Sequence, residues 1–336
     1  MMKLFIFGST GDLVKRKVLL ALQELNVPDL KIYALGRRNL GECAYKDFIC
    51  SEQCSKKFRN SLNYLPLNFD NLSFEDLEPF LDREKINYFY LSVPPEVTSK
   101  ILIFLGKLKE KNYELKILGE KPFGEDLKSA EELRVLISNL NLKGHFFISD
   151  HYLFKKGFQK LPMNFKDVTF VSIESVGLEG RINYYDSVGA LKDMIQSHFF
   201  NVINKNLGFK IDFSKARLIE FVFGQYEGYV EELGKISSTE TYVLLKFELF
   251  GKTFEFITGK GFFNKIGFME IDGKIYEMGD ENSYVDLFKD FLNKDFKNFV
   301  NENDSIFAWE FIEELQRRKR PEFRIYERNK KDWKLN

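Results

Sequence analysis

The sequence is poor in histidine, cysteine and proline, and it has no excess of charge of either sign. Its 336 residues include only 3 histidines, 3 cysteines and 8 prolines, and 50 Lys and Arg residues balance 50 Asp and Glu residues. Balanced charge excludes a global field that would attract nucleic acid or an acidic membrane surface. Scarce proline, together with 36 phenylalanines, excludes a largely disordered chain.

Long apolar runs are also missing. No apolar stretch is long enough to span a bilayer, and residues 1–5 enter a short strand rather than a cleavable signal pattern. Cys43, Cys50 and Cys54 are odd in number, clustered and without a histidine nearby. We expect them to be free thiols rather than a metal site or a disulfide framework. These features predict a soluble cytoplasmic protein without a metal, a nucleic-acid partner or a membrane partner.

Strand-like and helix-like segments alternate over the first 150 residues. Short apolar runs at 4–7, 32–35, 88–93, 115–118 and 146–148 are typical of buried strands. Apolar residues recur at helical spacing over 13–25, 97–111 and 129–137. This alternation predicts a Rossmann-like α/β domain over residues 1–150, with a doubly wound parallel sheet.

After Asp150 the pattern changes to a period of two. Strand-like segments occupy 168–173, 241–249, 254–257 and 268–271, and helical patterns occur near 190–203, over 284–299 and over 305–317. We therefore expect a second, α+β domain over residues 151–336. Its antiparallel sheet would have one face covered by helices.

A dinucleotide-binding pattern follows the first strand. A strand ending at Phe7, then Gly8-x-x-Gly11 and a helix, is the order in which a helix N-terminus binds a pyrophosphate. The two-glycine pattern alone also fits an ordinary turn. After the second strand, Arg37 and Arg38 stand where NAD-binding Rossmann proteins place an acidic residue. Arginine suits a 2′-phosphate, so we favour NADP, with NAD as the alternative cofactor and a solvated arginine pair as the alternative interpretation.

Two of the three histidines lie beside aspartates. His151 follows Asp150, and His198 ends the segment that begins at Asp193. Histidine suits proton transfer near neutral pH, so both are candidates for a catalytic base. His198 also lies on an apolar stripe, and on the residues alone a core histidine is the favoured interpretation. In an α-helix Asp193 and His198 would lie about 140° apart and would not share a face.

A series of motifs in one order resembles the glucose-6-phosphate dehydrogenase family. These motifs are residues 8–17, Glu120-Lys121-Pro122-Phe123-Gly124, residues 150–155, 179–186 and 192–198, Gly224-Gln225-Tyr226, Gly259-Lys260 and Ala308-Trp309. The chain departs from the family at Phe154, which replaces a glycine, and at Ile182-Asn183, which replace two glycines. It is also shorter than ordinary members, with the loss between Val202 and Arg217 and after Tyr226.

The resemblance implies a reaction and a set of site residues. The reaction is oxidation of the C1 hydroxyl of β-D-glucose 6-phosphate to 6-phospho-D-glucono-1,5-lactone with hydride transfer to NADP, the first oxidative step of the pentose phosphate pathway. His198 would be the base and Asp150 its hydrogen-bond partner. The implied substrate-binding residues are His151, Tyr152, Lys155, Glu174, Asp193, Lys260, Lys265 and Lys17. The implied cofactor-binding residues are Gly8, Ser9, Thr10, Gly11, Asp12, Leu13, Arg37, Lys121 and Pro122.

Further implications concern geometry and assembly. The family often has a cis proline at the position of Pro122, and it commonly forms a homodimer or homotetramer through its large sheet. Non-functional interpretations remain for three residues. Lys17 and Lys265 could be solvated surface lysines, and Glu174 could lie on an exposed strand face.

Two other functions stay open. One is a dehydrogenase for another sugar phosphate; the candidate phosphate ligands argue against an unphosphorylated sugar. The other is a non-catalytic NADP-binding sensor. The joint presence of His198, Asp150 and the phosphate ligands argues against the sensor.

Overall fold

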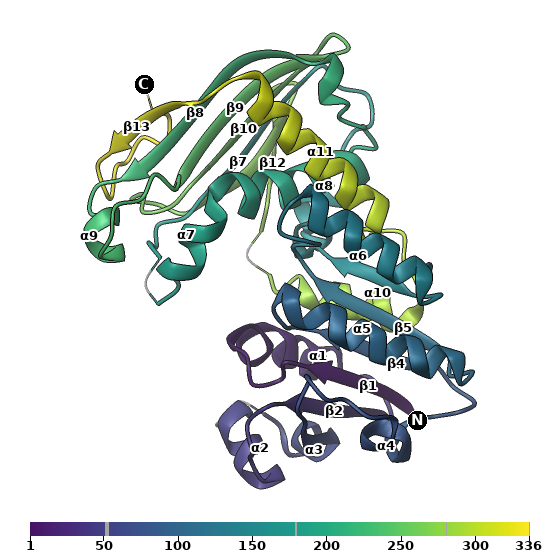
Figure 1. The fold of residues 1–336 in the computed structure, drawn as a ribbon. Coiled ribbons are helices and arrows are strands. Elements are labelled where there is room, and N and C mark those ends of the chain that lie inside the picture. Colours follow the sequence, from purple (N-terminus) through teal and green to yellow (C-terminus); the bar gives the residue numbers. More distant parts are fainter. Residues whose placement is uncertain (51–53, 179, 280, 336) are drawn as a thin grey trace. The chain divides into compact units, whose positions relative to one another are not determined.

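The computed structural model describes residues 1–50, 54–178, 180–279 and 281–335 (Figure 1). The chain divides into two compact units, one of Met1–Phe154 with Asn282–Ile306 and one of Lys155–Glu281 with Phe307–Asn336. The sequence placed a single boundary after residue 150 and did not predict the return of residues 282–306 to the first unit. Among the described helices, none combines the length and apolarity that a membrane crossing needs.

The first unit is built on a parallel sheet whose strand order is β3-β2-β1-β4-β5-β6. The strands are β1 (Met2–Phe7), β2 (Leu30–Gly36), β3 (Leu62–Pro66), β4 (Asn87–Leu91), β5 (Leu115–Glu120) and β6 (Phe146–Ser149). This is the order of dinucleotide-binding Rossmann sheets, and it confirms the predicted doubly wound class. Strand β3 was not predicted from the sequence. It is an edge strand that buries only Leu62 and Tyr64, so it has no continuous apolar run.

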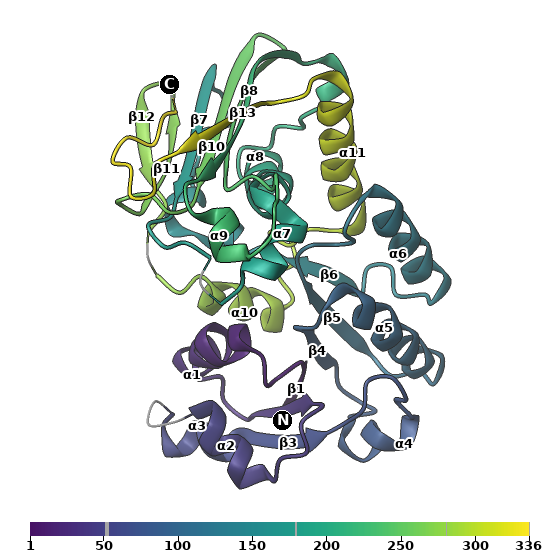
Figure 2. The same cartoon turned by 60° about the vertical axis from the view of Figure 1, so that its left-hand side comes forward.

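Helices lie on both faces of this sheet (Figures 1 and 2). They are α1 (Leu19–Leu25), preceded by the π-helical turn η1 (Val14–Val18), α2 (Glu42–Cys50), α3 (Lys56–Ser61), α4 (Phe74–Leu77), α5 (Pro95–Glu110), α6 (Leu127–Asn139) and α10 (Tyr284–Asn293). Helix α10 packs on β4 through edge-to-face pairs, Tyr88 with Phe291 at 5.4 Å and Tyr90 with Phe288 at 5.2 Å between ring centroids. The predicted helix over 284–299 is too long. Lys294 adopts φ 64°, and this left-handed residue ends the helix.

The expectation that the three cysteines are free is wrong for two of them. Cys50 and Cys54 form a disulfide, and Cys43 is free and exposed. Cys50 ends α2, and the chain brings the two Cα atoms to 5.1 Å, within the span that a disulfide bridges. The spacing of the cysteines in the sequence did not reveal this disulfide.

The second unit contains a mixed sheet with the order β12-β11-β7-β10-β9-β8-β13. Its strands are β7 (Asp167–Ile173), β8 (Arg217–Tyr226), β9 (Tyr242–Leu249), β10 (Lys252–Gly259), β11 (Ile266–Ile271), β12 (Lys274–Glu277) and β13 (Glu322–Tyr326). The expected antiparallel arrangement is corrected at two pairs, because β7 runs parallel to β10 and β13 runs parallel to β8. Long connections precede both parallel partners, as parallel pairing requires, and a period of two does not reveal strand direction.

One face of this second sheet is covered by helices, as predicted (Figures 1 and 2). They include α7 (Ile182–Ala190), the π-helical segment η5 (Leu191–Phe199), α8 (Phe200–Lys205) and α11 (Glu302–Arg318), while α9 (Tyr229–Leu233) follows β8. Segment η5 is fixed by Phe199, whose ring stacks on Phe170 of β7 at 3.8 Å and meets Phe256 of β10 edge-on at 5.6 Å. Aromatic packing therefore attaches the segment that carries His198 to the centre of the sheet.

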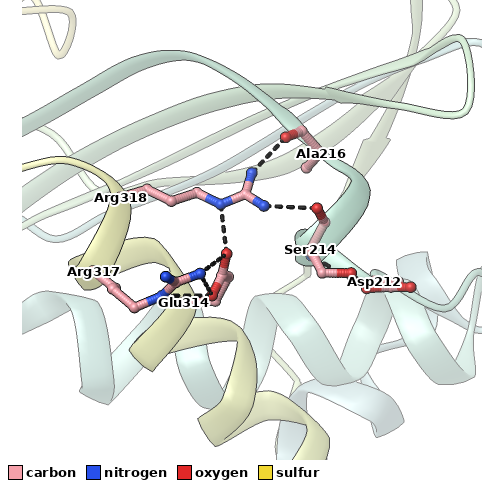
Figure 3. A network of polar contacts seen from close by, with 6 residues as sticks. All are labelled: Asp212, Ser214, Ala216, Glu314, Arg317 and Arg318. Atoms are coloured by element: carbon pink, nitrogen blue, oxygen red, sulfur yellow. Dashed lines mark hydrogen bonds and ion pairs between the residues drawn. The ribbon is translucent and has the colours of Figure 1, made fainter.

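The C-terminal end of α11 is tied to the chain before β8 by a polar network (Figure 3). Glu314 pairs with Arg317 at 2.8 Å and with Arg318 at 2.6 Å. The Arg318 guanidinium also donates to the carbonyls of Ala216 at 2.7 Å and Ser214 at 2.6 Å. The hydrogen bonds from the two arginines hold the pKa of the Glu314 carboxyl below its ordinary value.

We predict that Phe199→Ala destabilises the second unit by about 3–5 kcal/mol, because it removes a buried ring and leaves a cavity. Phe199 is 0% exposed, whereas Phe323 of β13 is 42% exposed. Phe323→Ala is therefore the control and should cost much less. Denaturant unfolding of the three proteins measures this difference, and equal losses for the two variants would contradict the packing role of Phe199.

Candidate active site

The glycine loop of the first unit has the geometry that a close approach between strand ends requires. Gly8 follows β1 with φ 78°, and a Cβ there would collide with the carbonyl oxygen of Ser92, just beyond β4. The Ser9 N–H donates to Leu35 of β2 at 3.0 Å, and the Gly11 N–H donates to Gly8 at 2.9 Å. The loop thus lies where the strand order reverses, with a helix N-terminus beginning directly after it. Gly8, Ser9, Thr10 and Gly11 form this loop, and Asp12 and Leu13 lie in the first turn of the helix that follows it.

The end of β2 comes close to the glycine loop. A Cβ added to Gly36 would lie 3.1 Å from Cγ2 of Thr10, so Arg37 begins beside the loop. Arg37 and Arg38 are exposed. The Arg38 guanidinium lies over the Phe48 ring at 5.2 Å, and the backbone carbonyl of Arg38 accepts a hydrogen bond from the Tyr64 hydroxyl at 2.6 Å. Residues 36–40 contain no carboxylate that would repel a 2′-phosphate.

The Lys121–Pro122 peptide bond is cis, as the resemblance implied. A cavity of about 320 Å³ adjoins it within the first unit. Its lining comes from the C-terminal end of β5, the N-terminal end of α5 and helix α6. It includes Gly119, Pro122, Phe123 and Pro95. The loop after β5 therefore borders open space at the carboxyl edge of the sheet.

Asp150 and His151 begin a short turn after β6 and lie in a cluster of aromatic and acidic groups. Asp150 is fully buried, and its Oδ1 accepts from the Tyr152 N–H at 3.0 Å. The His151 ring stacks on Tyr284 of α10, with centroids 5.5 Å apart. The Tyr284 hydroxyl donates in turn to Glu120 Oε1 at 3.4 Å, and the Tyr90 hydroxyl donates to the same oxygen.

Burial raises the pKa of the Glu120 carboxyl, with Asp150 acting in the same direction and the hydrogen bond from Tyr90 opposing it. Glu120 and Asp150 are neighbouring acidic groups, and two negative charges close together repel, so the pair favours retention of a proton. Glu120 belongs to the motif at residues 120–124, but the motif predicted no role for it. The sequence predicted that Tyr284 belongs to the second domain, whereas α10 packs beside β4 in the first unit. Nothing in the local pattern of α10 indicates this packing.

In the second unit, Glu174 and Lys260 meet because their strands are parallel neighbours. Glu174 follows β7, Lys260 follows β10, and Ile173 pairs with Gly259 at the strand ends. The Lys260 ammonium lies 2.7 Å from Glu174 Oε2 and 3.9 Å from Asp193 Oδ2. It also lies over the Tyr185 ring at 5.4 Å. Three residues predicted to bind substrate, Glu174, Asp193 and Lys260, are thus brought together.

Asp193 and His198 both lie on η5, and the expectation that they do not share a face is wrong. That expectation assumed an α-helix. In a π-helix hydrogen bonds join residues five apart, so positions i and i+5 come onto neighbouring turns of one face. His198 is 2% exposed. π-Helical segments are rare and often occur at functional sites, and η5 places the predicted base and a predicted sugar-binding residue on one face.

The remaining predicted lysines occupy different places. Lys155 in the second unit is partly buried, and its ammonium donates to the carbonyls of Gly279 at 3.1 Å and Glu281 at 3.4 Å. Lys265 is exposed in the loop between β10 and β11. Lys17 is exposed at the end of η1 in the first unit, where its carbonyl accepts from Asn282 at 3.2 Å. Glu179, from the motif at 179–186, lies outside the described residues.

Two further residues of the second unit, Tyr185 and Glu240, adjoin the cluster around Lys260 and were not predicted from the sequence. The Tyr185 hydroxyl is buried, and burial raises its pKa well above the ordinary value, with Asp193, Glu240 and Glu174 adding to the rise. Glu240 is 9% exposed and contacts the start of η5. Tyr185 could have been selected from the sequence, because it lies in the motif at residues 179–186. Glu240 could not, because it precedes a strand and belongs to no motif.

Each unit presents groups whose chemistry suits a particular kind of ligand. Carboxylates of Glu174 and Asp193 accept hydrogen bonds, and the Lys260 ammonium donates them. A cluster of acceptors around one donor suits a ligand with several hydroxyl groups. In the first unit, a glycine loop and a nearby arginine suit the phosphates of a dinucleotide.

Comparison with known proteins agrees with this chemistry. Residues 5–160 match the model of the "Glucose-6-phosphate dehydrogenase, NAD binding domain", and residues 155–205 match that of the "Glucose-6-phosphate dehydrogenase, C-terminal domain". The chain is 30% identical over 291 residues to the glucose-6-phosphate 1-dehydrogenase of Helicobacter pylori, covering 72% of this chain and 68% of that protein. It is 29% identical over 337 residues to the enzyme of Borreliella burgdorferi, covering 80% of this chain and 70% of that protein.

A solved structure of a glucose-6-phosphate dehydrogenase in complex with its substrate superimposes with a TM-score of 0.83. It is 20% identical and covers 98% of this chain and 95% of that chain, so it supports the fold. Together with the sequence relatives, these matches show that the chain belongs to the glucose-6-phosphate dehydrogenase family.

Proposed function

We propose that this chain oxidises the C1 hydroxyl of β-D-glucose 6-phosphate to 6-phospho-D-glucono-1,5-lactone, with NADP as hydride acceptor. The observation that carries the proposal is the cluster of Glu174, Asp193 and Lys260 in the second unit. The cluster supplies hydrogen-bonding groups for a sugar, and one of its members, Asp193, lies on the same segment as His198. Membership of the family supports the substrate.

His198 is the proposed base. As the C1–H bond breaks, His198 takes the proton of the C1 hydroxyl and the C1–O bond becomes a carbonyl. Asp150 is the proposed hydrogen-bond partner that fixes the histidine tautomer and stabilises the imidazolium. Its burial and its hydrogen bond from the Tyr152 N–H support this role, because they hold the carboxyl group in one orientation.

The sugar phosphate needs cationic and neutral hydrogen-bond donors. We assign this task to Lys155, His151 and Tyr152, with Lys17 and Lys265 as further proposed ligands. The stacking of His151 on Tyr284 and the two backbone carbonyls at Lys155 support the assignment, because they restrict both side chains. Restricted donors lose less conformational entropy when they bind an anion.

The residues of the first unit fit a dinucleotide. When bound, the nicotinamide supplies the acceptor for the hydride from C1. Gly8, Ser9, Thr10, Gly11, Asp12 and Leu13 would hold the pyrophosphate against the helix N-terminus. Arg37 would bind the 2′-phosphate of NADP. Lys121 and Pro122, beside the cavity after β5, would face the nicotinamide end.

The family also suggests a cellular setting. We propose that the chain acts in the cytoplasm in the first oxidative step of the pentose phosphate pathway, and that it forms a homodimer or homotetramer. Size measurement in solution tests the assembly.

The wild-type protein should reduce NADP when given glucose 6-phosphate, as followed by absorbance of the reduced nicotinamide. His198→Asn should lower kcat by about 100- to 10,000-fold, the usual contribution of a general base, with KM nearly unchanged. His145→Asn is the control, because His145 bonds the Leu115 carbonyl at 3.0 Å within the first unit. NADP binding without turnover of any sugar phosphate by the wild type would favour the sensor.

Lys155→Ala should raise KM for glucose 6-phosphate roughly tenfold or more, since a hydrogen bond to a charged group contributes about 1.5–3 kcal/mol. The effect on kcat should be smaller. Lys156→Ala is the matched control, because its side chain is exposed on the next residue. Steady-state kinetics of both variants measures KM and kcat separately. An unchanged KM in Lys155→Ala would contradict the assignment of Lys155 to the phosphate site.

Arg37→Ala should reduce the preference for NADP over NAD by about 1.5–3 kcal/mol, the contribution of a charge-assisted hydrogen bond. The readout is the ratio of kcat/KM for the two cofactors. Arg83→Ala is the control, because this arginine lies over Tyr113 at 4.8 Å in the same unit and pairs with Glu78. The assignment of Arg37 fails if its variant keeps the wild-type ratio.

A further inference from the structure

The helix that carries Asp193 and His198 begins at a backbone break. Gly189 has φ 71° and ψ 167°, which interrupts the helical path between α7 and η5. A restarting helix presents N–H groups without partners inside the helix, and these need acceptors when they are buried. Ala190 is 1% exposed and Leu191 is 1% exposed, so both N–H groups lie in the interior.

Glu240 supplies the acceptors for both groups. Its Oε1 accepts from the Leu191 N–H at 2.8 Å, and its backbone carbonyl accepts from the Ala190 N–H at 3.0 Å. A Cβ added to Gly189 would stand 2.7 Å from Cδ of Glu240, so only glycine leaves room for this carboxyl group. The break in the helix at Gly189 and the buried carboxyl group of Glu240 therefore depend on each other.

We propose that Glu240 is a positioning residue for the dehydrogenase reaction, whose carboxyl group fixes the first turn of η5 and thereby the places of Asp193 and His198. The inference rests on the proposed function and extends it to a residue that touches neither substrate nor cofactor. Asp193 lies two residues beyond Leu191, and His198 lies on the next turn of the same face. A shift of the first turn therefore moves both groups.

The other end of the segment is already fixed. Phe199 stacks on Phe170 in the sheet, so η5 is held at its C-terminal end by packing and at its N-terminal end by Glu240. Catalytic geometry is sensitive to displacements of about 1 Å, which can cost roughly 100-fold in rate. Loss of the Glu240 anchor should therefore reduce turnover before it unfolds the unit.

The charge environment of Glu240 supports a measurable titration. Burial raises the pKa of its carboxyl to about 7, and the Leu191 N–H and the Lys192 charge oppose that rise. The groups that face it are Lys192 of η5, Tyr185 of α7 and Tyr229 of α9. Because the native carboxyl keeps a proton that the unfolded chain has lost, its contribution to stability is full below about pH 4.5 and is lost as the pH rises toward 7.

The test compares Glu240→Ala, Glu240→Gln and Asp272→Ala. Asp272 is the matched control, since its carboxylate accepts from the Lys166 N–H at 3.0 Å and the Asp167 N–H at 2.8 Å at the opposite end of β7. Glu240→Ala should lower kcat at least tenfold with KM for NADP unchanged. Glu240→Gln should retain most of the activity, because its amide oxygen can still accept the Leu191 N–H. Asp272→Ala should lower Tm without lowering kcat.

Two readouts do not depend on turnover. With only 3 histidines in the chain, the imidazole ¹⁵N signals can be assigned by substitution. Glu240→Ala should shift the His198 signal and Asp272→Ala should not. The Tm of the wild type relative to Glu240→Gln should fall between pH 5 and pH 8.

The outcomes separate the two proposals. If the wild type shows no turnover, the proposed function fails, while the imidazole signal still decides the role of Glu240. A folded Glu240→Ala protein with wild-type kcat and an unshifted His198 signal would overturn the positioning role. So would an equal loss of kcat in Asp272→Ala, because it would reduce the effect to general stability.

Discussion

The parallel pairing of β7 with β10 is the constraint on which the candidate site depends. It places Glu174 and Lys260 at adjacent strand ends, where the ammonium lies 2.7 Å from the carboxylate. Lys260 is only 6% exposed, and a buried charge is tolerated when it is paired and hydrogen-bonded. The sheet therefore holds a donor and acceptors ready for a ligand, and an antiparallel partner for β7 at this edge would have separated them.

Segment η5 links this polar cluster to the hydrophobic core. Phe199 packs into the sheet, while Asp193 reaches Lys260 from the neighbouring part of the same segment. The π-helical hydrogen-bond pattern brings Asp193 and His198 onto one face, which an α-helix of the same sequence would not do. A single segment thus carries a packing anchor, a proposed sugar-binding residue and the proposed base, so the position of each depends on the others.

Local patterns in the sequence were sufficient where one segment determines the outcome. The glycine loop, the central strands of the first sheet and the motifs around Asp150 and Lys260 all carry their signal within a few residues. The misses concern relations between distant segments or departures from standard geometry. Strand direction at β7, the packing of α10 on β4 and the contact of Glu240 with η5 depend on tertiary structure. The π-helical segment η5 depends on a backbone conformation that periodicity does not encode, and the spacing of the cysteines did not reveal the Cys50–Cys54 disulfide.

The two units contribute different parts to one family: a Rossmann sheet with a glycine loop, and a mixed sheet with the cluster of Glu174, Asp193 and Lys260. The most direct test of this account is a crystal structure with glucose 6-phosphate bound. We predict that the sugar hydroxyls lie within hydrogen-bond distance of Glu174 and Asp193, and that the C1 hydroxyl faces His198. A sugar phosphate bound away from these three side chains would contradict the account.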